Sequence, residues 1–237
     1  MDTKAQSIKN NNTEVLKEWP GAFGSYKYSR AVMVSNLGPL IAIILIYTFI
    51  YGFIYAIILM FDFIFRNSAS FYIFFNMVFY SIIYVIGILT SSAFIHAQIQ
   101  SAKGKQVDVI ASFQVVYSKL LNIIIGTILT GLIATASILL LIIPAFFIIP
   151  RIYLVLYYII DQDISPTDAL SLSWEKTKGN VGKIYGILGF ILLLLIGIFI
   201  PILGWAALIY FGFMYYAIGT VFYFYIKKEK ILIPIKK

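Results

Sequence analysis

The sequence predicts an all-α integral membrane protein with six transmembrane helices, arranged as three hairpins that each follow an interfacial amphipathic helix. Three observations lead to this prediction. Hydrophobic residues make up 61% of the 237 residues and charged residues only 12%, and the mean hydropathy of +0.93 is far from that of a water-soluble domain. Most of the chain lies in continuous apolar runs of roughly 20 residues or more, the length that crosses a bilayer. A short polar segment with a Ser–aromatic pair precedes each pair of runs.

The chain begins with a polar segment, residues 1–20, which we expect to be cytoplasmic. This segment shows no basic start, apolar centre and small-residue cleavage site of a secretory signal. Membrane insertion is therefore expected to depend on the first spanning helix. The Lys- and Asn-rich opening as far as Asn12 offers too little apolar surface to offset the entropy of ordering, so it is expected to be disordered.

The long apolar runs are expected to be helices, because backbone amides must be paired in hydrocarbon and because the hydrophobicity is continuous rather than alternating. Residues 21–226 are interpreted as one six-helix domain. Pro144 and Pro150 indicate a break between the third and fourth spans, and Pro150 is also compatible with a kink in a helix that starts earlier. The expected spans are residues 36–65, 71–100, 119–143, 145–160, 181–200 and 203–226, with the turn Pro201-Ile-Leu-Gly204 between the last two.

Lysine and arginine concentrate on alternate connections between the spans, with only Arg66 and Arg151 elsewhere. Because basic residues gather on cytoplasmic flanks, we predict a multi-pass protein of the cell membrane with both termini cytoplasmic and very short outward loops. Residues 227–237 form a basic cytoplasmic tail. The net charge of +8 is attributed to these flanks, which also favour anionic headgroups, and not to nucleic-acid binding.

An internal repeat is expected over residues 21–101, 107–160 and 165–226. Each copy begins with a small residue and a Ser–aromatic pair, followed by a polar or basic stretch that runs into the next span. The aromatic residues of these pairs are expected to anchor the short helices at the membrane interface. The aligned pairs are Ser25-Tyr26, Ser112-Phe113 and Ser173-Trp174.

The third copy carries the clearest helix start. Ser165 is a favourable N-cap, Pro166 occupies the first helical position, and Asp168 follows the cap by three residues. We predict a helix from this point that lies in the headgroup region. At helical spacing Leu170, Trp174 and Thr177 share the face that is expected to be apolar.

The region PRIYLVLYYIIDQDISPTDALSLSWEKTKGN resembles the membrane domain associated with some glycerophosphoryl diester phosphodiesterases, and related six-helix membrane protein families of unknown function. The resemblance lies in the order of Arg151-x-Tyr153 in an apolar helix, acids at its cytoplasmic end, Ser-Pro-x-x-Ala-Leu, Ser-Trp and Lys-Gly. In those proteins the phosphodiesterase chemistry belongs to a separate soluble barrel domain, which these 237 residues do not contain. The resemblance therefore implies no catalytic residues here.

The residue inventory is poor in catalytic and metal-binding groups. The sequence has no cysteine and a single histidine, His96, whereas a zinc site needs three or four ligands and a Ser-His-Asp triad needs a positioned imidazole. We therefore expect no catalytic residues, no metal site and no cofactor, and we interpret the protein as not an enzyme.

Arg151 is the strongest candidate for a functional residue, because a charged side chain inside a span is costly. It is interpreted as a contact for a lipid phosphate or an anionic substrate. Two other interpretations are pairing with helix-end carbonyl groups freed near Pro150 and snorkelling to the outer headgroups.

The remaining polar candidates have simpler interpretations. His96, close to Gln98 and Gln100, is a candidate polar relay for protons or else a hydrogen-bonded interface residue. Asp62 and Arg66 are spaced for a helical ion pair. Asp161 and Asp163 precede a helix N-terminus, where capping and solvation are expected for both carboxylates.

The leading functional hypothesis is a non-enzymatic membrane-organising or accessory factor that acts through membrane lipids, another membrane protein or a homo-oligomer, without nucleic acid. The alternative is a small transporter or permease-like component with an intramembrane site near Arg151. A third hypothesis, a lipid-modifying enzyme, requires Asp161, Asp163 and His96 to converge in space.

Overall fold

The computed structural model describes residues 14–16, 18–65, 68–140, 142–196, 199–200 and 202–232. Nearly all of this part of the chain is helical, and its only strands, β1 (Glu14–Val15) and β2 (Lys230–Ile231), form one antiparallel pair. The opening to residue 13, Arg66, Pro201 and residues 233–237 lie outside the described residues. The helices are α2 (Gly21–Gly24), α3 (Tyr26–Ser35), α4 (Leu37–Phe65), α5 (Ala69–Ala102), α6 (Val109–Ser118), α7 (Leu120–Leu140), α8 (Ile142–Ile152), α9 (Val155–Gln162), α10 (Pro166–Lys176), α11 (Val181–Ile196), α12 (Leu203–Tyr215) and α13 (Ile218–Lys227).

Several helices have the length and composition of membrane spans, which confirms the prediction of an all-helical chain with several membrane-length apolar helices. By these criteria five segments qualify in the described chain, and a sixth does so if α10 and α11, which are bent by 93°, form one broken span. This architecture is compatible with a multi-pass membrane protein. The five are residues 37–65, 69–102, 120–140, 144–162 and 203–227.

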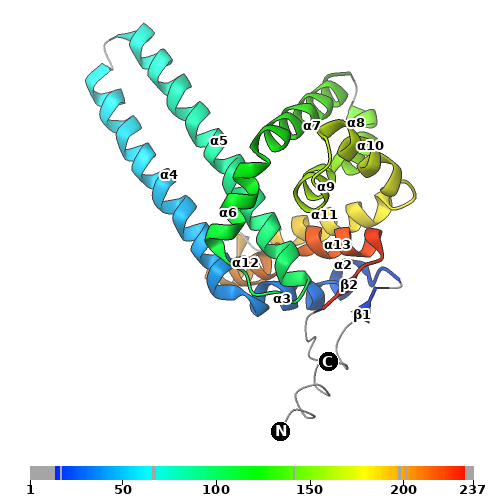
Figure 1. Ribbon diagram of the computed structural model, residues 1–237. Helices are drawn as coiled ribbons and strands as arrows, with labels where there is room; N and C mark the ends of the chain where they lie inside the picture. The colour runs from blue at the N-terminus through cyan, green and yellow to red at the C-terminus, as the bar shows by residue number, and fades with distance from the viewer. Residues whose placement is uncertain are drawn as a thin grey trace.

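Helices α4 and α5 pack side by side as a long hairpin that projects from the rest of the molecule, at the upper left of Figure 1. With 29 residues, α4 is about 43 Å long at 1.5 Å per residue, which exceeds the hydrocarbon thickness of roughly 30 Å. Its outer half exposes large apolar side chains such as Phe53, Leu59 and Phe63. Lipid solvates such a surface favourably, whereas water does not.

The buried core lies at the other end of that hairpin, in a region that we call the base. It comprises α3, the C-terminal part of α5, α9 and α13, together with β1 and β2. Figure 1 shows α3, β1 and β2 at the lower side of the molecule, with α13 and α9 above them. The largest fully buried side chains include Tyr158, Tyr223, Phe222 and Phe224. The interior is therefore concentrated where the helices converge.

Both ends of the described chain are tied to this base. Leu16 is buried, and the Trp19 ring meets the Phe222 ring edge-on with centroids 5.3 Å apart. Ile231 is fully buried, and β2 pairs with β1. The described parts of the polar segment 1–20 and of the basic tail 227–237 are thus packed structure and not free extensions.

Two predicted spans, residues 145–160 and 203–226, each contain a short interruption of the helix, although each still counts as one segment of membrane length. Helix α8 gives way to α9 around Tyr153–Leu154, and α12 gives way to α13 around Tyr216–Ala217. Pro150 lies inside α8 and does not end it. The predicted span 181–200 is described as a helix only for Val181–Ile196, and residues 197–198 lie outside the described chain.

Each break frees backbone carbonyl groups, and side-chain hydroxyls bind them. Ser173 on α10 donates to the Arg151 carbonyl at 2.6 Å, and Ser29 on α3 donates to the Met214 carbonyl at 2.7 Å. The Phe146 carbonyl, whose usual partner would be the missing amide of Pro150, accepts from the Tyr185 hydroxyl. Such pairing is what makes irregular backbone tolerable at membrane depth.

The face of α10 that packs on other helices is not the face that carries Trp174. Trp174 is 43% exposed, while Ala169 and Ser173 are fully buried. The helix therefore packs on a stripe that also contains Pro166 and ends at the buried Thr177. Small side chains on this stripe permit close contact with α7 and α9, against which α10 lies.

Candidate functional site

Arg151 lies at the end of α8 and faces α10. Its guanidinium carbon is 5.2 Å from the centroid of the Trp174 ring, and its Nη1 donates to the Trp174 carbonyl at 3.3 Å. One interpretation of the sequence was that Arg151 pairs with backbone carbonyl groups near Pro150. In the described chain it donates to no carbonyl there, and the carbonyl that it binds belongs to Trp174 on α10. The stacking over Trp174 is a cation–π contact that holds the guanidinium in place.

A surface groove of about 910 Å³ surrounds this pair between α8 and α10. Apolar side chains of α8 form one wall, and the polar side contains Arg151, Lys178 and the opposing carboxylate of Glu175. The groove thus combines an excess of positive charge with an apolar surface, which are the two features that a phospholipid headgroup and its first methylene groups contact. Its lining is Pro144, Phe147, Ile148, Arg151, Ser171, Trp174, Glu175 and Lys178.

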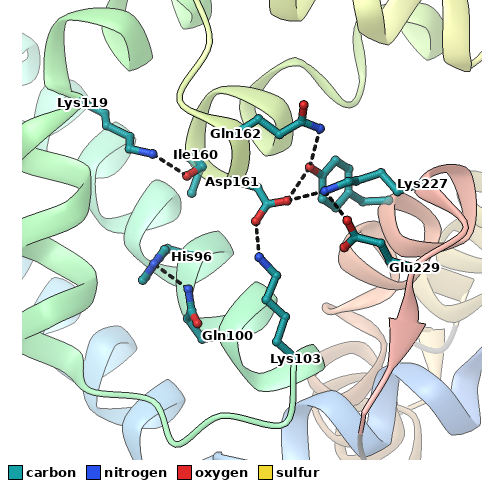
Figure 2. Close-up of polar contacts among 10 residues, drawn as sticks. His96, Gln100, Lys103, Lys119, Ile160, Asp161, Gln162, Lys227 and Glu229 are labelled. Atoms are coloured by element: carbon teal, nitrogen blue, oxygen red, sulfur yellow. Dashed lines mark hydrogen bonds and ion pairs between the residues drawn. The ribbon is translucent and has the colours of Figure 1, made fainter. Parts of the chain in front are cut away.

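His96 lies on α5 and is 9% exposed. Its Nδ1 is 3.2 Å from the Ser112 hydroxyl, and its Nε2 is 3.1 Å from the amide nitrogen of Gln100, as Figure 2 shows for Gln100. Gln98 points elsewhere and accepts from the Thr220 hydroxyl. The imidazole therefore bridges α5 and α6 through neutral partners, an arrangement that suits an interface residue.

Asp161 does not occupy the solvated position that the sequence analysis expects. Its side chain is only 4% exposed and forms ion pairs with Lys103 at 2.5 Å and Lys227 at 2.8 Å. The Tyr223 hydroxyl also donates to it, at 2.8 Å. Figure 2 shows the carboxylate between these groups, with Gln162 and Glu229 at the edge of the cluster. Both carboxylate oxygens are engaged, so the cluster joins α5, α9 and α13.

Asp163 does lie in solvent, with 65% of its side chain exposed, and it pairs with Lys119 at 3.4 Å. It has a positive φ of 56° at the end of α9. Lys119 also donates to the Ile160 carbonyl at 3.0 Å (Figure 2). Asp163 therefore ends α9 away from the Asp161 cluster. Asp62 accepts from the Asn76 amide at 2.7 Å, and its expected partner Arg66 lies outside the described residues.

The three predicted anchors sit in unlike surroundings. Tyr26 packs against Phe211, with ring centroids 5.6 Å apart, Phe113 is partly buried against the core, and Trp174 stacks with Arg151. The aligned serines share more, since Ser25, Ser112 and Ser173 are all buried. Serine rather than the aromatic residue is thus the common packing element of the three short helices.

Ser165 is the N-cap of α10. Its hydroxyl accepts from the Asp168 amide at 3.2 Å and donates to the Asp168 carboxylate at 2.6 Å, and Pro166 occupies the first turn. Asp168 thereby also places negative charge at the positive end of the helix. The two residues together hold the start of α10 in place.

We expect Ser165→Ala to lower the free energy of unfolding by about 1 kcal/mol, because the Asp168 amide loses its partner. Chemical denaturation of the detergent-solubilised protein measures this loss. Ser171→Ala, an exposed change on the same helix, should stay within about 0.5 kcal/mol of the native protein. Equal effects of the two changes would contradict a capping role.

A feature that the sequence analysis did not find is a central cavity of about 560 Å³ between α5, α9, α11 and the α12–α13 segment. Its lining includes Tyr153, Tyr157 and Gln98, together with Leu194 and Leu208. The spacing of Tyr153 and Tyr157, four residues apart in an apolar run, was the available signal, because such residues share a helix face.

Comparison with models of known protein families, with curated proteins and with solved structures finds no match to this chain. The resemblance to the phosphodiesterase-associated membrane domain therefore stays a prediction from the sequence. Within the part of the chain that the structure describes, no three His, Asp or Glu side chains gather as a metal-binding group.

Proposed function

We propose that this protein is a non-enzymatic, six-span protein of the cell membrane that acts as a membrane-organising or accessory factor by holding anionic lipid. The observation that carries the proposal is the groove between α8 and α10, where Arg151 and Lys178 border an apolar wall. The arginine is held in place by Trp174. A fixed guanidinium suits two-pronged binding of a phosphate group.

The six spans are proposed to form three units, each a short helix followed by a hairpin. Contacts between helices support this layout. The short helix α6 packs on α5, α10 packs on α9, and α3 packs on α12 and α13. Each short helix thus lies against the hairpin of another unit, and α3 closes the circle between the first and the last unit.

The proposed orientation places the base on the cytoplasmic side. Lys103, Lys119 and Lys227 all belong to the base or its edge (Figure 2), whereas the outer half of the α4–α5 hairpin exposes mainly apolar side chains. Basic residues favour the cytoplasmic side and anionic headgroups. Both termini are then cytoplasmic.

The test is lipid binding by native mass spectrometry of the detergent-extracted protein, with added phosphatidylglycerol. We expect Arg151→Ala to weaken phosphatidylglycerol binding by about tenfold, because hydrogen bonds to a charged group are lost. Arg151→Lys should restore only part of the binding, since an ammonium group lacks the planar fork.

The matched control is Lys176→Ala, which removes one positive charge from the exposed face of the same α10 helix outside the groove lining. This variant should bind phosphatidylglycerol as the native protein does. If Arg151→Ala binds the lipid normally but melts at a lower temperature, Arg151 has a structural role and the proposal is wrong.

The transporter alternative is favoured by a different observation, the central cavity. Arg151 does not line that cavity, so a transport site near Arg151 itself receives no support from the geometry. Uptake by proteoliposomes, measured for native protein and for Gly212→Leu in the cavity lining, separates the two functions, because an accessory factor should show no flux in either case.

A further inference from the structure

The central cavity lies among side chains that are polar but uncharged. Its lining residues with polar groups are Tyr153, Tyr157, Tyr215, Tyr216, Ser91 and Gln98, and no charged side chain of the described chain lines it. Leucine and isoleucine residues of α11 and α12 complete the wall. Its volume of about 560 Å³ is within the usual range for sites that bind small molecules.

Gln98, one of the polar lining residues, has only a weak partner for its amide nitrogen. Gln98 is 1% exposed, accepts from Thr220 at 2.8 Å and directs its amide group at the Met33 sulfur, 3.8 Å away. Thioether sulfur is a weak acceptor, and a primary amide has two N–H groups. A hydrogen bond from a ligand hydroxyl or carbonyl group therefore contributes more binding free energy at this amide than at an amide that already has a strong acceptor.

A second cavity adjoins the central one. Ser91 and the 61% exposed Tyr216 also line this second cavity of about 320 Å³ between α4, α5 and α12. The remaining lining of this second space is mainly apolar and aromatic, with Ile43, Phe94 and Phe213 among it. A molecule with one polar end and one apolar chain matches the lining of these two adjoining cavities.

We propose that the central cavity binds one amphiphile with an uncharged headgroup rich in hydroxyl groups, such as a monoacylglycerol. The headgroup lies against Gln98, Tyr153 and Tyr157, and the acyl chain passes Ser91 and Tyr216 into the second cavity. An anionic headgroup is disfavoured there, because the lining offers no cation to offset its desolvation. This site is separate from the groove at Arg151 and does not depend on it.

The experiment uses the full chain in phosphatidylcholine nanodiscs and a monoacylglycerol with a photoactivatable diazirine in its acyl chain. We expect the diazirine in the acyl chain to label peptides of residues 87–94 and 213–216, which line the second cavity. Excess monoolein should suppress this labelling, and excess phosphatidylglycerol should not. Labelling of residues 49–60 on the exposed half of α4 should resist both competitors, since that surface contacts bulk lipid.

Gly212→Leu is the decisive variant. Gly212 lines the cavity, and a Cβ at this position meets no atom within 4 Å, so a leucine side chain can occupy part of the cavity and obstruct a ligand there. It should abolish the labelling that monoolein suppresses. Gly131→Leu on α7, where a Cβ also meets nothing within 4 Å and which is outside the cavity, should label normally.

The paired change Tyr153→Phe and Tyr157→Phe tests the headgroup contacts. It removes two hydroxyls at constant ring volume and should weaken monoolein competition by about fivefold or more. Normal labelling of Gly212→Leu, or equal competition by phosphatidylglycerol and monoolein, overturns the proposal. A thermal melt of each variant verifies that a loss of labelling does not reflect unfolding.

Discussion

Asp161→Asn is expected to lower the free energy of unfolding by about 3 kcal/mol or more, the largest effect of any single change that we predict. The change keeps the size of the side chain but removes its charge. Lys103 then loses its partner, and Lys227 keeps only Glu229 among the described residues, 2.7 Å away, in a cluster where the Asp161 carboxylate is only 4% exposed. Breaking one side of a buried ion pair leaves an uncompensated charge, which is the costly case. Denaturant titration of the solubilised protein measures the loss.

Asp163→Asn is the matched control, because it is the same substitution two residues away at a side chain that is 65% exposed. Its effect should stay below about 1 kcal/mol, as for other solvated pairs. Replacing the whole cluster, as Lys103→Met, Asp161→Leu and Lys227→Met together, should recover much of the stability, since no buried charge is then left without a partner. Similar losses of unfolding free energy for Asp161→Asn and Asp163→Asn would show that the cluster contributes little to stability.

Gly219→Ala is expected to destabilise the base by about 1–3 kcal/mol, the range for an overpacked core. A Cβ at this position would clash with the Tyr157 hydroxyl and would lie 2.7 Å from the Tyr153 hydroxyl. Both rings pack where α9 meets α13, and Tyr157 stacks on Tyr223 with centroids 5.6 Å apart. The rings must shift to admit even one methyl group. The midpoint of thermal unfolding measures the effect.

Two further variants identify the cause. Gly219→Ala combined with Tyr157→Phe should recover part of the loss, because the closest clashing atom is removed. Gly131→Ala should be neutral or slightly stabilising, since a Cβ there meets nothing within 4 Å and alanine is the better helix former. A melting point for Gly219→Ala equal to that of Gly131→Ala would mean that the two tyrosines move freely.

Local signals allowed several features to be predicted from the sequence. The first spanning helix is expected from residue 36, and α4 begins at Leu37. The start of α10 follows from Ser165, Pro166 and Asp168. These features depend on neighbouring residues alone, through hydrophobic length, capping and the missing amide of proline. The two breaks at Tyr153–Leu154 and Tyr216–Ala217 carried no such signal.

The breaks are stabilised from distant parts of the chain. The Met214 carbonyl accepts from Ser29, 185 residues earlier, and the Arg151 carbonyl accepts from Ser173 on another helix. A sequence window cannot show which serine will reach a freed carbonyl. The sequence also cannot show which stripe of α10 is buried, because that depends on the helices that α10 packs against. Trp174 is therefore exposed for a reason that only the tertiary structure shows.

The sequence by itself determined that the chain is helical, that it contains several apolar segments of membrane length, and where its basic residues cluster. Composition and local spacing are sufficient for these properties, because the bilayer imposes the same requirement on every segment. Only the tertiary structure decided that Asp161 is buried between Lys103 and Lys227, which are 58 and 66 residues away. It also decided that the tyrosines near Gly219 border a cavity. Both depend on the packing of α5, α9 and α13, because a charge or a hydroxyl acquires its partners only when distant helices converge.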